Sequence, residues 1–186
     1  IEGLYALSIK NLSIDIALPT LVPAIISGLK LDDQTIATLR AALDRKDEAT
    51  LSSLATHLGK NTTRQLTAML RATGPAEAAL TSLAKLNLPE VAAGERSSLE
   101  SVINDIRTAT PKLNLTVDLV ESRGLEYHTG VTFTIFAKGI RGELGRGGRY
   151  LAGSKGTKES EPATGMTLFM DSVLRALPAA QKEKRL

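Results

Sequence analysis

Residues 123–130 read Arg-Gly-Leu-Glu-Tyr-His-Thr-Gly, residues 131–138 read Val-Thr-Phe-Thr-Ile-Phe-Ala-Lys, and residues 145–150 read Gly-Arg-Gly-Gly-Arg-Tyr. The middle segment alternates along its length and therefore predicts a strand with Val131, Phe133, Ile135 and Ala137 on one face. The glycines at 139 and 142 predict a turn back into an antiparallel hairpin. Such a hairpin would bring the first and last segments together, so we expect them to form one pocket.

These two segments are rich in residues that bind small anions. An arginine can hold a carboxylate or phosphate through two parallel hydrogen bonds, glycines let the backbone approach a ligand, and tyrosine combines a flat ring with a hydroxyl. Two alternatives remain open: the glycine-arginine run as a solvated turn, and Tyr127 packed under the sheet with its hydroxyl satisfied. The candidate binding residues are Arg123, Glu126, Tyr127, His128, Gly147, Gly148, Arg149 and Tyr150.

The order and spacing of the two segments resemble the two histidine-recognition motifs of histidyl-tRNA synthetase and of its non-catalytic relative, the regulatory subunit of ATP phosphoribosyltransferase. The resemblance covers residues 117–177 and includes a third motif beginning at Gly165. It implies that Arg123 faces a carboxylate and an activated phosphate, and that His128 and Tyr150 line an imidazole pocket. Many members of the family have tyrosine where this chain has His128.

The resemblance implies an α+β fold of the class II aminoacyl-tRNA synthetase type, with an antiparallel sheet, flanking helices and an all-helical insertion. Strand-like segments at 4–9 and 113–120 flank a helical region, as expected for an insertion within one sheet-centred domain. We therefore expect a synthetase-like core at 1–19 and 110–186 and a helical insertion with connecting helices at 20–109. The expected helices run from Asp32 or Asp33 to Leu43, from Asp47 through Leu58, from Asn61 to Ala72, from Pro75 to near Leu86, and from Ser97 to Ala109.

The first residue, Ile1, is not an initiator methionine, and the chain opens directly into the strand-like segment at 4–9. The sequence is therefore expected to be a C-terminal fragment. On the family's layout, the upstream part would carry the first two class II motifs and the surface for self-association.

The third motif predicts whether the chain can activate an amino acid. In active class II synthetases it contains a glycine that lets the nucleotide approach and a Glu-Arg pair whose arginine holds the ATP triphosphate. In this chain Phe169 stands at the glycine, and Asp171 and Ser172 stand at the pair. A neutral hydroxyl cannot replace a charged guanidinium, so the resemblance implies that adenylation is lost. Arg175, one helical turn later, could reach back and is kept as an alternative.

The apolar residues of the third motif predict a buried strand that leads into a helix. They are Met166, Leu168, Met170, Val173, Leu174 and Leu177.

Composition excludes several other classes of protein. The chain has no cysteine, and its two histidines, His57 and His128, are far apart, so neither a zinc site nor any other metal site or cofactor is expected. The longest apolar stretch, 16–29, is too short for a bilayer and contains two prolines, and no signal peptide is recognisable, so a cytoplasmic protein is expected. With a net charge of +3 and 3% aromatic residues, nucleic-acid binding is not indicated.

The function implied by the resemblance is that of a regulatory subunit without aminoacylation activity. Its expected partner is the short-form catalytic subunit of ATP phosphoribosyltransferase, with which it would support the first step of histidine biosynthesis. Histidine is the candidate ligand, and whether it acts there as a feedback signal is left open. The alternatives are a fragment of an active histidyl-tRNA synthetase that uses ATP, histidine and tRNA, and a stand-alone amino-acid-binding module.

Overall fold

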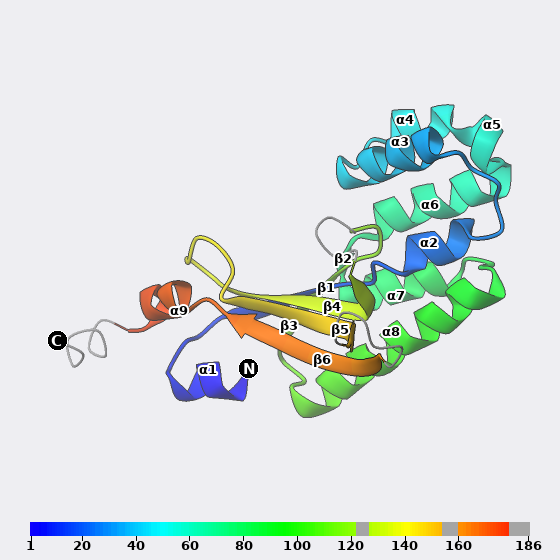
Figure 1. Ribbon diagram of the computed structural model, residues 1–186. Helices are drawn as coiled ribbons and strands as arrows, with labels where there is room; N and C mark the ends of the chain where they lie inside the picture. The colour runs from blue at the N-terminus through cyan, green and yellow to red at the C-terminus, as the bar shows by residue number, and fades with distance from the viewer. Residues whose placement is uncertain (122–126, 154–159, 179–186) are drawn as a thin grey trace.

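The structure, a computed structural model, describes residues 1–121, 127–153 and 160–178. Within these residues six strands form one sheet in the order β2-β3-β1-β4-β5-β6 (Figure 1). Neighbouring strands are antiparallel, except that β1 and β3 run parallel. The strands are β1 Leu12–Ala17, β2 Gly74–Pro75, β3 Asn114–Asp118, β4 His128–Ala137, β5 Gly145–Ala152 and β6 Glu161–Leu168.

The central strands separate an apolar face from a polar one because successive side chains point to opposite sides. Ile14, Leu115 and Ile135 are buried on the face that packs against helices, and Ile14 is paired with both of the others. Asp15 and its partner Thr116 point to the opposite face, where the Thr116 hydroxyl donates to the Asp15 carboxylate. Within the described residues no helix packs on this polar face, so this helix-free face is the one available to a ligand.

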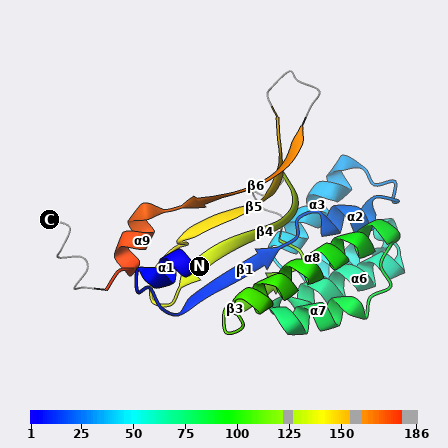
Figure 2. The ribbon, with the colours of Figure 1, turned by 90° about the horizontal axis from the view of Figure 1, so that it is seen from below.

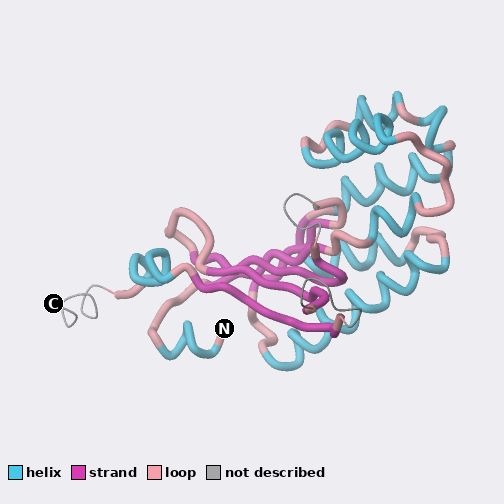
Figure 3. The backbone as a smooth tube through the Cα atoms, viewed as in Figure 1, coloured by secondary structure: helices cyan, strands magenta, loops and turns pink. Residues whose placement is uncertain are grey.

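Helices form a block at one end of the sheet, seen at the right of Figures 1 and 3. Within it α7 contacts β2 and β3, α8 contacts β4, and α2 packs against α8. The helices α3 to α6 pack on one another farther out, while α1 and α9 lie at the other end of the sheet (Figure 2). The bounds are α1 Glu2–Ala6, α2 Leu21–Ile26, α3 Asp33–Asp44, α4 Glu48–Ser53, α5 Ala55–Leu58, α6 Lys60–Ala72, α7 Ala76–Ala84, α8 Glu90–Ala109 and α9 Met170–Ala176.

Two aspartates fix the starts of helices in the block, as the sequence predicted. The Asp32 carboxylate accepts a hydrogen bond from the Thr35 amide at 2.7 Å and begins α3. The Asp47 carboxylate accepts from the amide and hydroxyl of Thr50 at 3.0 and 2.6 Å and begins α4. These hydrogen bonds satisfy amides that have no partner within the helix, and they lower the pKa of both carboxyl groups.

The prediction of a strand at 4–9 is wrong. That segment begins as the short helix α1, which buries Leu4, and the first strand starts only at Leu12. Ser8 and Asn11, with φ angles of 61° and 53°, turn the chain between the two elements. The alternating pattern failed because a five-residue helix is too short to show its own period.

The predicted start of the last long helix is also wrong. The helix α8 begins at Glu90, seven residues before Ser97, and passes through Gly94. A glycine inside a helix costs about 1 kcal/mol relative to alanine, which is small enough for packing to offset. Ala92 and Leu99, both fully buried, supply that packing on either side of Gly94.

The prediction of a buried core around the third motif holds for only two of its residues. Val173 and Leu177 are buried, but Met166 is 55% exposed, and Leu168, Met170 and Leu174 are exposed as well. A Cβ at Gly147 would touch both Met166 and Phe133, so these residues lie on the same face of the sheet as the buried Ile135. The apolar face therefore continues into β5 and β6 without burying the side chains there.

The expected fold class is confirmed: a sheet that is antiparallel except for one pair, with flanking helices and a helical block inserted between β1 and β3. The division at residues 19/20 and 109/110 stays a prediction, since the buried core is one cluster that runs through both parts. Among the described residues, no helix is both long and apolar enough to cross a lipid bilayer.

Candidate ligand pocket

A pocket of about 660 Å³ lies on the helix-free face of the sheet, where β1, β3, β4, β5 and β6 contribute side chains. Its volume falls within the range of roughly 300–1,000 Å³ that is typical of small-molecule sites. Four of the predicted residues line it: Tyr127, His128, Gly147 and Tyr150. The hairpin therefore brings the two sequence motifs together, as the alternation of residues 131–138 indicated.

Three of these residues meet because β4 and β5 pair in register. His128 pairs with Tyr150, and a bulge follows between His128 and Thr132. The Tyr127 and His128 rings lie 3.9 Å apart, and the Tyr127 and Tyr150 rings lie 6.3 Å apart in an edge-on arrangement. His128 is buried, whereas Tyr127 is 66% exposed, so the alternative in which Tyr127 packs under the sheet is wrong.

The glycines of 145–150 belong to strand β5, so the alternative of a solvated turn is also wrong. A Cβ on Gly148 would lie 2.6 Å from His128 Cδ2 and 2.7 Å from Thr132 Cγ2. A Cβ on Gly147 would collide with the Gly165 carbonyl oxygen of β6. Protein contacts within the pocket wall therefore require glycine at these two positions, whereas the sequence pattern indicated glycines that let a ligand approach the backbone.

Of the other predicted residues, the structure describes Gly148 and Arg149 but neither Arg123 nor Glu126. Arg149 is exposed and its side chain packs along Gly130, outside the pocket lining. Arg123 and Glu126 lie outside the described residues. Among the described residues that line the pocket, Arg146 supplies the guanidinium group. Its Cζ lies 5.8 Å from the centre of the Phe169 ring, and its Nη1 lies 3.7 Å from Glu143 Oε1.

The pocket contains acidic residues that sequence reasoning did not identify. Asp15, Asp118 and Glu121 line it together with Arg146. Within the described lining, the carboxylates of Asp15 and Glu121 stand beside the Arg146 guanidinium, while Asp118 is paired with Lys46, so the arrangement suits a ligand with both a positive and a negative group. Asp15 is more than a hundred positions away from the histidine motif and becomes a neighbour only through the pairing of β1 with β4, for which the sequence carried no signal.

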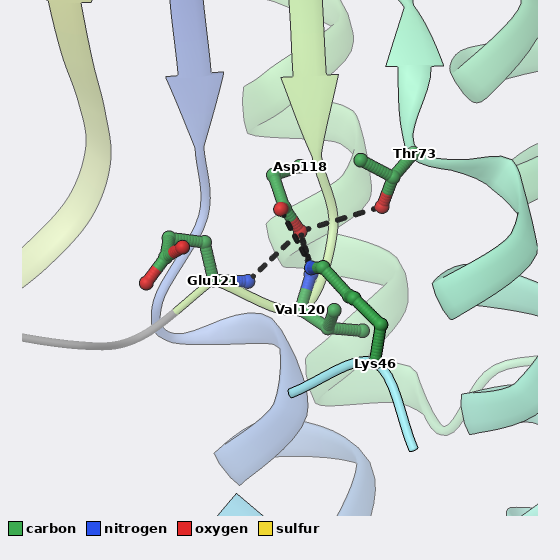
Figure 4. Close-up of polar contacts among 5 residues, drawn as sticks. All are labelled: Lys46, Thr73, Asp118, Val120 and Glu121. Atoms are coloured by element: carbon green, nitrogen blue, oxygen red, sulfur yellow. Dashed lines mark hydrogen bonds and ion pairs between the residues drawn. The ribbon is translucent and has the colours of Figure 1, made fainter. Parts of the chain in front are cut away.

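Asp118 ties the pocket to the helical block (Figure 4). Its carboxylate accepts from Lys46 Nζ at 2.8 and 2.6 Å and from the Thr73 hydroxyl at 3.4 Å. It also accepts from the amides of Val120 and Glu121 at 3.0 and 3.1 Å. Asp118, at the end of β3, thus fixes the backbone that leads to Glu121. It also connects the end of β3 to Lys46 in the loop between α3 and α4.

The third motif forms the end of β6 and the start of α9. Phe169 is the N-cap residue of α9, and the buried Ser172 accepts a hydrogen bond from Arg175 Nη2 at 2.8 Å. Arg175 Nη1 also donates to Asp171 at 2.9 Å, and this hydrogen bond lowers the pKa of the Asp171 carboxyl. Arg175 is therefore engaged within its own helix, and it does not line the pocket.

The sheet, the helical block inserted between its strands and the histidine-motif pocket define a class II synthetase-like protein. The chain belongs to the histidyl-tRNA synthetase family, whose family model matches residues 1–173. Within that family it is 49% identical over 185 residues to the ATP phosphoribosyltransferase regulatory subunit of Paramagnetospirillum magneticum, and 44% identical to that of Rhodospirillum centenum. The resemblance that the two motifs indicated is thereby confirmed.

These relatives are longer proteins. The alignments cover 100% of this chain and 46% of each of the two relatives, so the chain spans about half their length. Among solved structures, an ATP phosphoribosyltransferase regulatory subunit/histidyl-tRNA synthetase from Bacillus halodurans C matches with a TM-score of 0.78 at 19% identity, covering 96% of this chain and 47% of that one. A histidyl-tRNA synthetase from Nostoc sp. PCC 7120 matches with a TM-score of 0.66 at 20% identity, covering 100% and 45%. Both have the same fold as this chain.

Proposed function

We propose that this chain is part of a regulatory subunit of ATP phosphoribosyltransferase, which works with a catalytic subunit in the first step of histidine biosynthesis. The observation that carries the proposal is the identity of 49%, 44% and 41% to relatives that all bear this name. An ATP phosphoribosyl transferase complex from Thermotoga maritima contains a chain of the same fold, with a TM-score of 0.66. That likeness supports a catalytic subunit as the partner.

The proposed ligand of the pocket is histidine. Its ammonium group would be attracted by the carboxylates of Asp15 and Glu121, and its carboxylate by the Arg146 guanidinium. The ring of the ligand would stack within the aromatic wall formed by Tyr127, His128 and Tyr150. A ligand carrying only negative charge would gain the Arg146 guanidinium but would also face the carboxylates of Asp15 and Glu121, which favours an amino acid over a free phosphate.

The subunit is proposed to lack amino-acid activation. A class II synthetase uses a fixed arginine of the third motif to hold the ATP triphosphate, and this chain has Ser172 at that position. Arg175, the arginine one helical turn later, is held by Asp171 and Ser172 and lies outside the pocket lining. The positive charge needed at a triphosphate would therefore be missing from this part of the site.

Histidine binding would regulate the assembly by linkage. If histidine binds one state of the complex more tightly than the other, it shifts the population towards that state and changes the transferase activity. The connection from the pocket through Asp118 to Lys46 offers a physical route for such a shift into the helical block.

Three measurements test the proposal. The purified protein with its complete upstream sequence should bind histidine in a calorimetric titration, and Tyr150→Ala should weaken that binding. It should stimulate phosphoribosyl transfer by the catalytic subunit, and it should not exchange pyrophosphate into ATP in the presence of histidine. Rapid pyrophosphate exchange would instead identify an active histidyl-tRNA synthetase. Histidine binding without any effect on the transferase would identify a stand-alone binding module.

A further inference from the structure

A second cavity lies in the helical block, well separated in sequence from the residues of the pocket. It is a groove between the exposed side of α6 and the end of α7, with a volume of about 660 Å³. Among the residues that the structure describes, its rim carries the four cations Lys60, Arg64, Arg71 and Lys85, and its lining includes no carboxylate. This positive charge stands out in a chain whose net charge is only +3.

Most of this charge is not neutralised by the protein itself. Arg71 pairs with Glu48 of α4 through hydrogen bonds of 2.9 and 2.5 Å. Arg64 donates to the neutral side chain of Asn61 at 3.0 Å. Across residues 1–121, 127–153 and 160–178, no carboxylate lies within ion-pair distance of Lys60, Arg64 or Lys85. Because Arg71 already binds the Glu48 carboxylate, we expect the free cations of this rim to bind carboxylates as well.

The start of α6 adds to the positive potential. Its N-cap residue is Gly59, which provides no side-chain acceptor, and its first turn contains Lys60 and no acidic residue. The N-terminus of a helix carries partial positive charge on its amide groups, and a lysine there adds to that charge. A carboxylate from outside would therefore gain from both the side chains and the helix end.

The floor of the groove is apolar and made of small side chains. Ala68, Ala72 and Leu86 are half-buried in it, and Thr67 lies between the cations along α6. The wall is held in place because Gln65 Nε2 donates to the Asn87 carbonyl oxygen just beyond the end of α7. Small residues let another backbone approach closely, so the floor fits the apolar side of a helix better than a bulky flat ligand.

We propose that this groove binds an acidic amphipathic helix of a protein partner. Lys60, Arg64 and Arg71 stand at positions i, i+4 and i+11 of α6 and so on nearly one line along the helix. At 1.5 Å per residue, the first two are about 6 Å apart and the outer two about 16 Å apart along the axis. A partner helix lying along α6 with carboxylates at the same spacing would meet Lys60, Arg64 and the Nη1 side of Arg71, whose Nε and Nη2 already donate to Glu48. Its small apolar side chains would rest on Ala68 and Ala72.

An RNA backbone would also be attracted by the cations, but the remainder of the groove disfavours it. The described part of the chain contributes no aromatic side chain to the groove, so unpaired bases would find no stacking surface there. The alanines and Leu86 would remain in contact with polar sugar and phosphate groups. An amphipathic helix satisfies the charged rim and the apolar floor at once.

Fluorescence anisotropy with a labelled peptide tests the proposal. The probe is an alanine- and leucine-faced helical peptide with glutamates at i, i+4 and i+11, and its control has lysines at those positions. The glutamate peptide should bind saturably and more weakly in high salt, while the lysine peptide should not bind. The variant Arg64→Glu should weaken binding by about tenfold, because it replaces an attractive charge with a repulsive one.

The matched control is Arg40→Glu, which makes the same charge change at an exposed position of α3 outside the groove. Its affinity for the peptide should stay within about twofold of the unaltered protein. Carbodiimide cross-linking adds a second readout that does not depend on variants, since the peptide glutamates should form amides with Lys60 or Lys85. Equal losses in both variants, or cross-links only to other lysines, would overturn the proposal. Tighter binding of a short RNA duplex than of the glutamate peptide would overturn it as well and would identify a nucleic-acid surface.

Discussion

Replacing Gly148 with alanine should displace the His128 ring from the wall of the pocket. The new methyl group would lie 2.6 Å from His128 Cδ2 and 3.0 Å from its Nε2, whereas ordinary contact begins at 3.4 Å, so the ring must retreat by about 0.8 Å. Thr132, whose Cγ2 would be 2.7 Å away, cannot yield easily, because it is buried and its hydroxyl donates to the Ala17 carbonyl oxygen at 3.3 Å. The strain therefore falls mainly on His128.

The expected cost follows from the packing of this wall. Inserting a methyl group into a well-packed interior typically costs about 1–3 kcal/mol. For a domain of this size, each kcal/mol lowers the melting temperature by roughly 2–4 °C. The Gly148→Ala variant should thus unfold at lower urea concentration and lower temperature than the unaltered protein. Histidine binding should weaken too if the pocket is the histidine site, but the loss of stability does not depend on that proposal.

Two measurements check this expectation together. Urea denaturation gives the change in the free energy of unfolding, and proton NMR of the imidazole rings reports on His128 directly. The sequence contains only two histidines, so the exposed His57 serves as an internal reference whose signals should not move. The His128 ring signals should shift markedly in the variant.

The matched control is Gly94→Ala in the interior of α8, where a Cβ would meet nothing within 4 Å. That change should stabilise the protein by about 0.5–1 kcal/mol, because alanine is a better helix former than glycine. If Gly148→Ala is as stable as the unaltered protein and leaves the His128 signals in place, then the pocket wall is not packed tightly against Gly148.

Three further expectations concern ion pairs and exposed apolar residues. In urea denaturation, Asp118→Ala should lower the free energy of unfolding by about 1–3 kcal/mol, because two backbone amides lose their acceptor. Lys46→Met removes only the half-exposed ion pair and should lower it by about 0.5–1 kcal/mol. Equal losses in the two variants would contradict this expectation. The hydrogen bond from Arg71 lowers the pKa of Glu48 below its ordinary value of 4.5. The stabilisation that this pair gives the folded protein is therefore present above pH 4.5 and is lost as the pH falls through the lowered pKa. In Arg71→Gln, that part of the acid-induced loss of stability should be absent from urea denaturation curves measured across this pH range. Met166→Gln should change stability by less than about 0.5 kcal/mol, because the side chain is 55% exposed, and a loss above 2 kcal/mol would show that it is buried after all.

The sequence predicted helices best where a residue with a specific local role marks their boundary. Asp32 and Asp47 cap α3 and α4 through contacts to residues three positions later, and such contacts are visible in the sequence itself. Gly94 misled the prediction of α8, because the packing that keeps the helix continuous comes from residues far away in the sequence.

The candidate site was predictable only within the hairpin. Tyr127, His128 and Tyr150 come together because β4 and β5 are consecutive strands, and their pairing is predicted by the alternation of residues 131–138 together with the turn glycines at 139 and 142. Asp15 and Asp118 were missed because the order β3-β1-β4 joins strands that are separated by the helical block. Nothing in the local pattern of either aspartate distinguishes it from an ordinary surface carboxylate.

The outer strand of the sheet affects how the 186-residue chain behaves when it is concentrated on its own. Among the described residues, no strand pairs with the free side of β6, and its two large apolar residues, Met166 and Leu168, are exposed. Unsatisfied backbone groups beside apolar side chains are a template on which another extended segment can add. Pro162, which lacks an amide hydrogen, hinders such addition at one end of the strand, but the stretch from Gly165 onward has no comparable barrier. Self-association that grows with protein concentration, and that polar substitutions at Met166 and Leu168 suppress, is the expected signature of this edge.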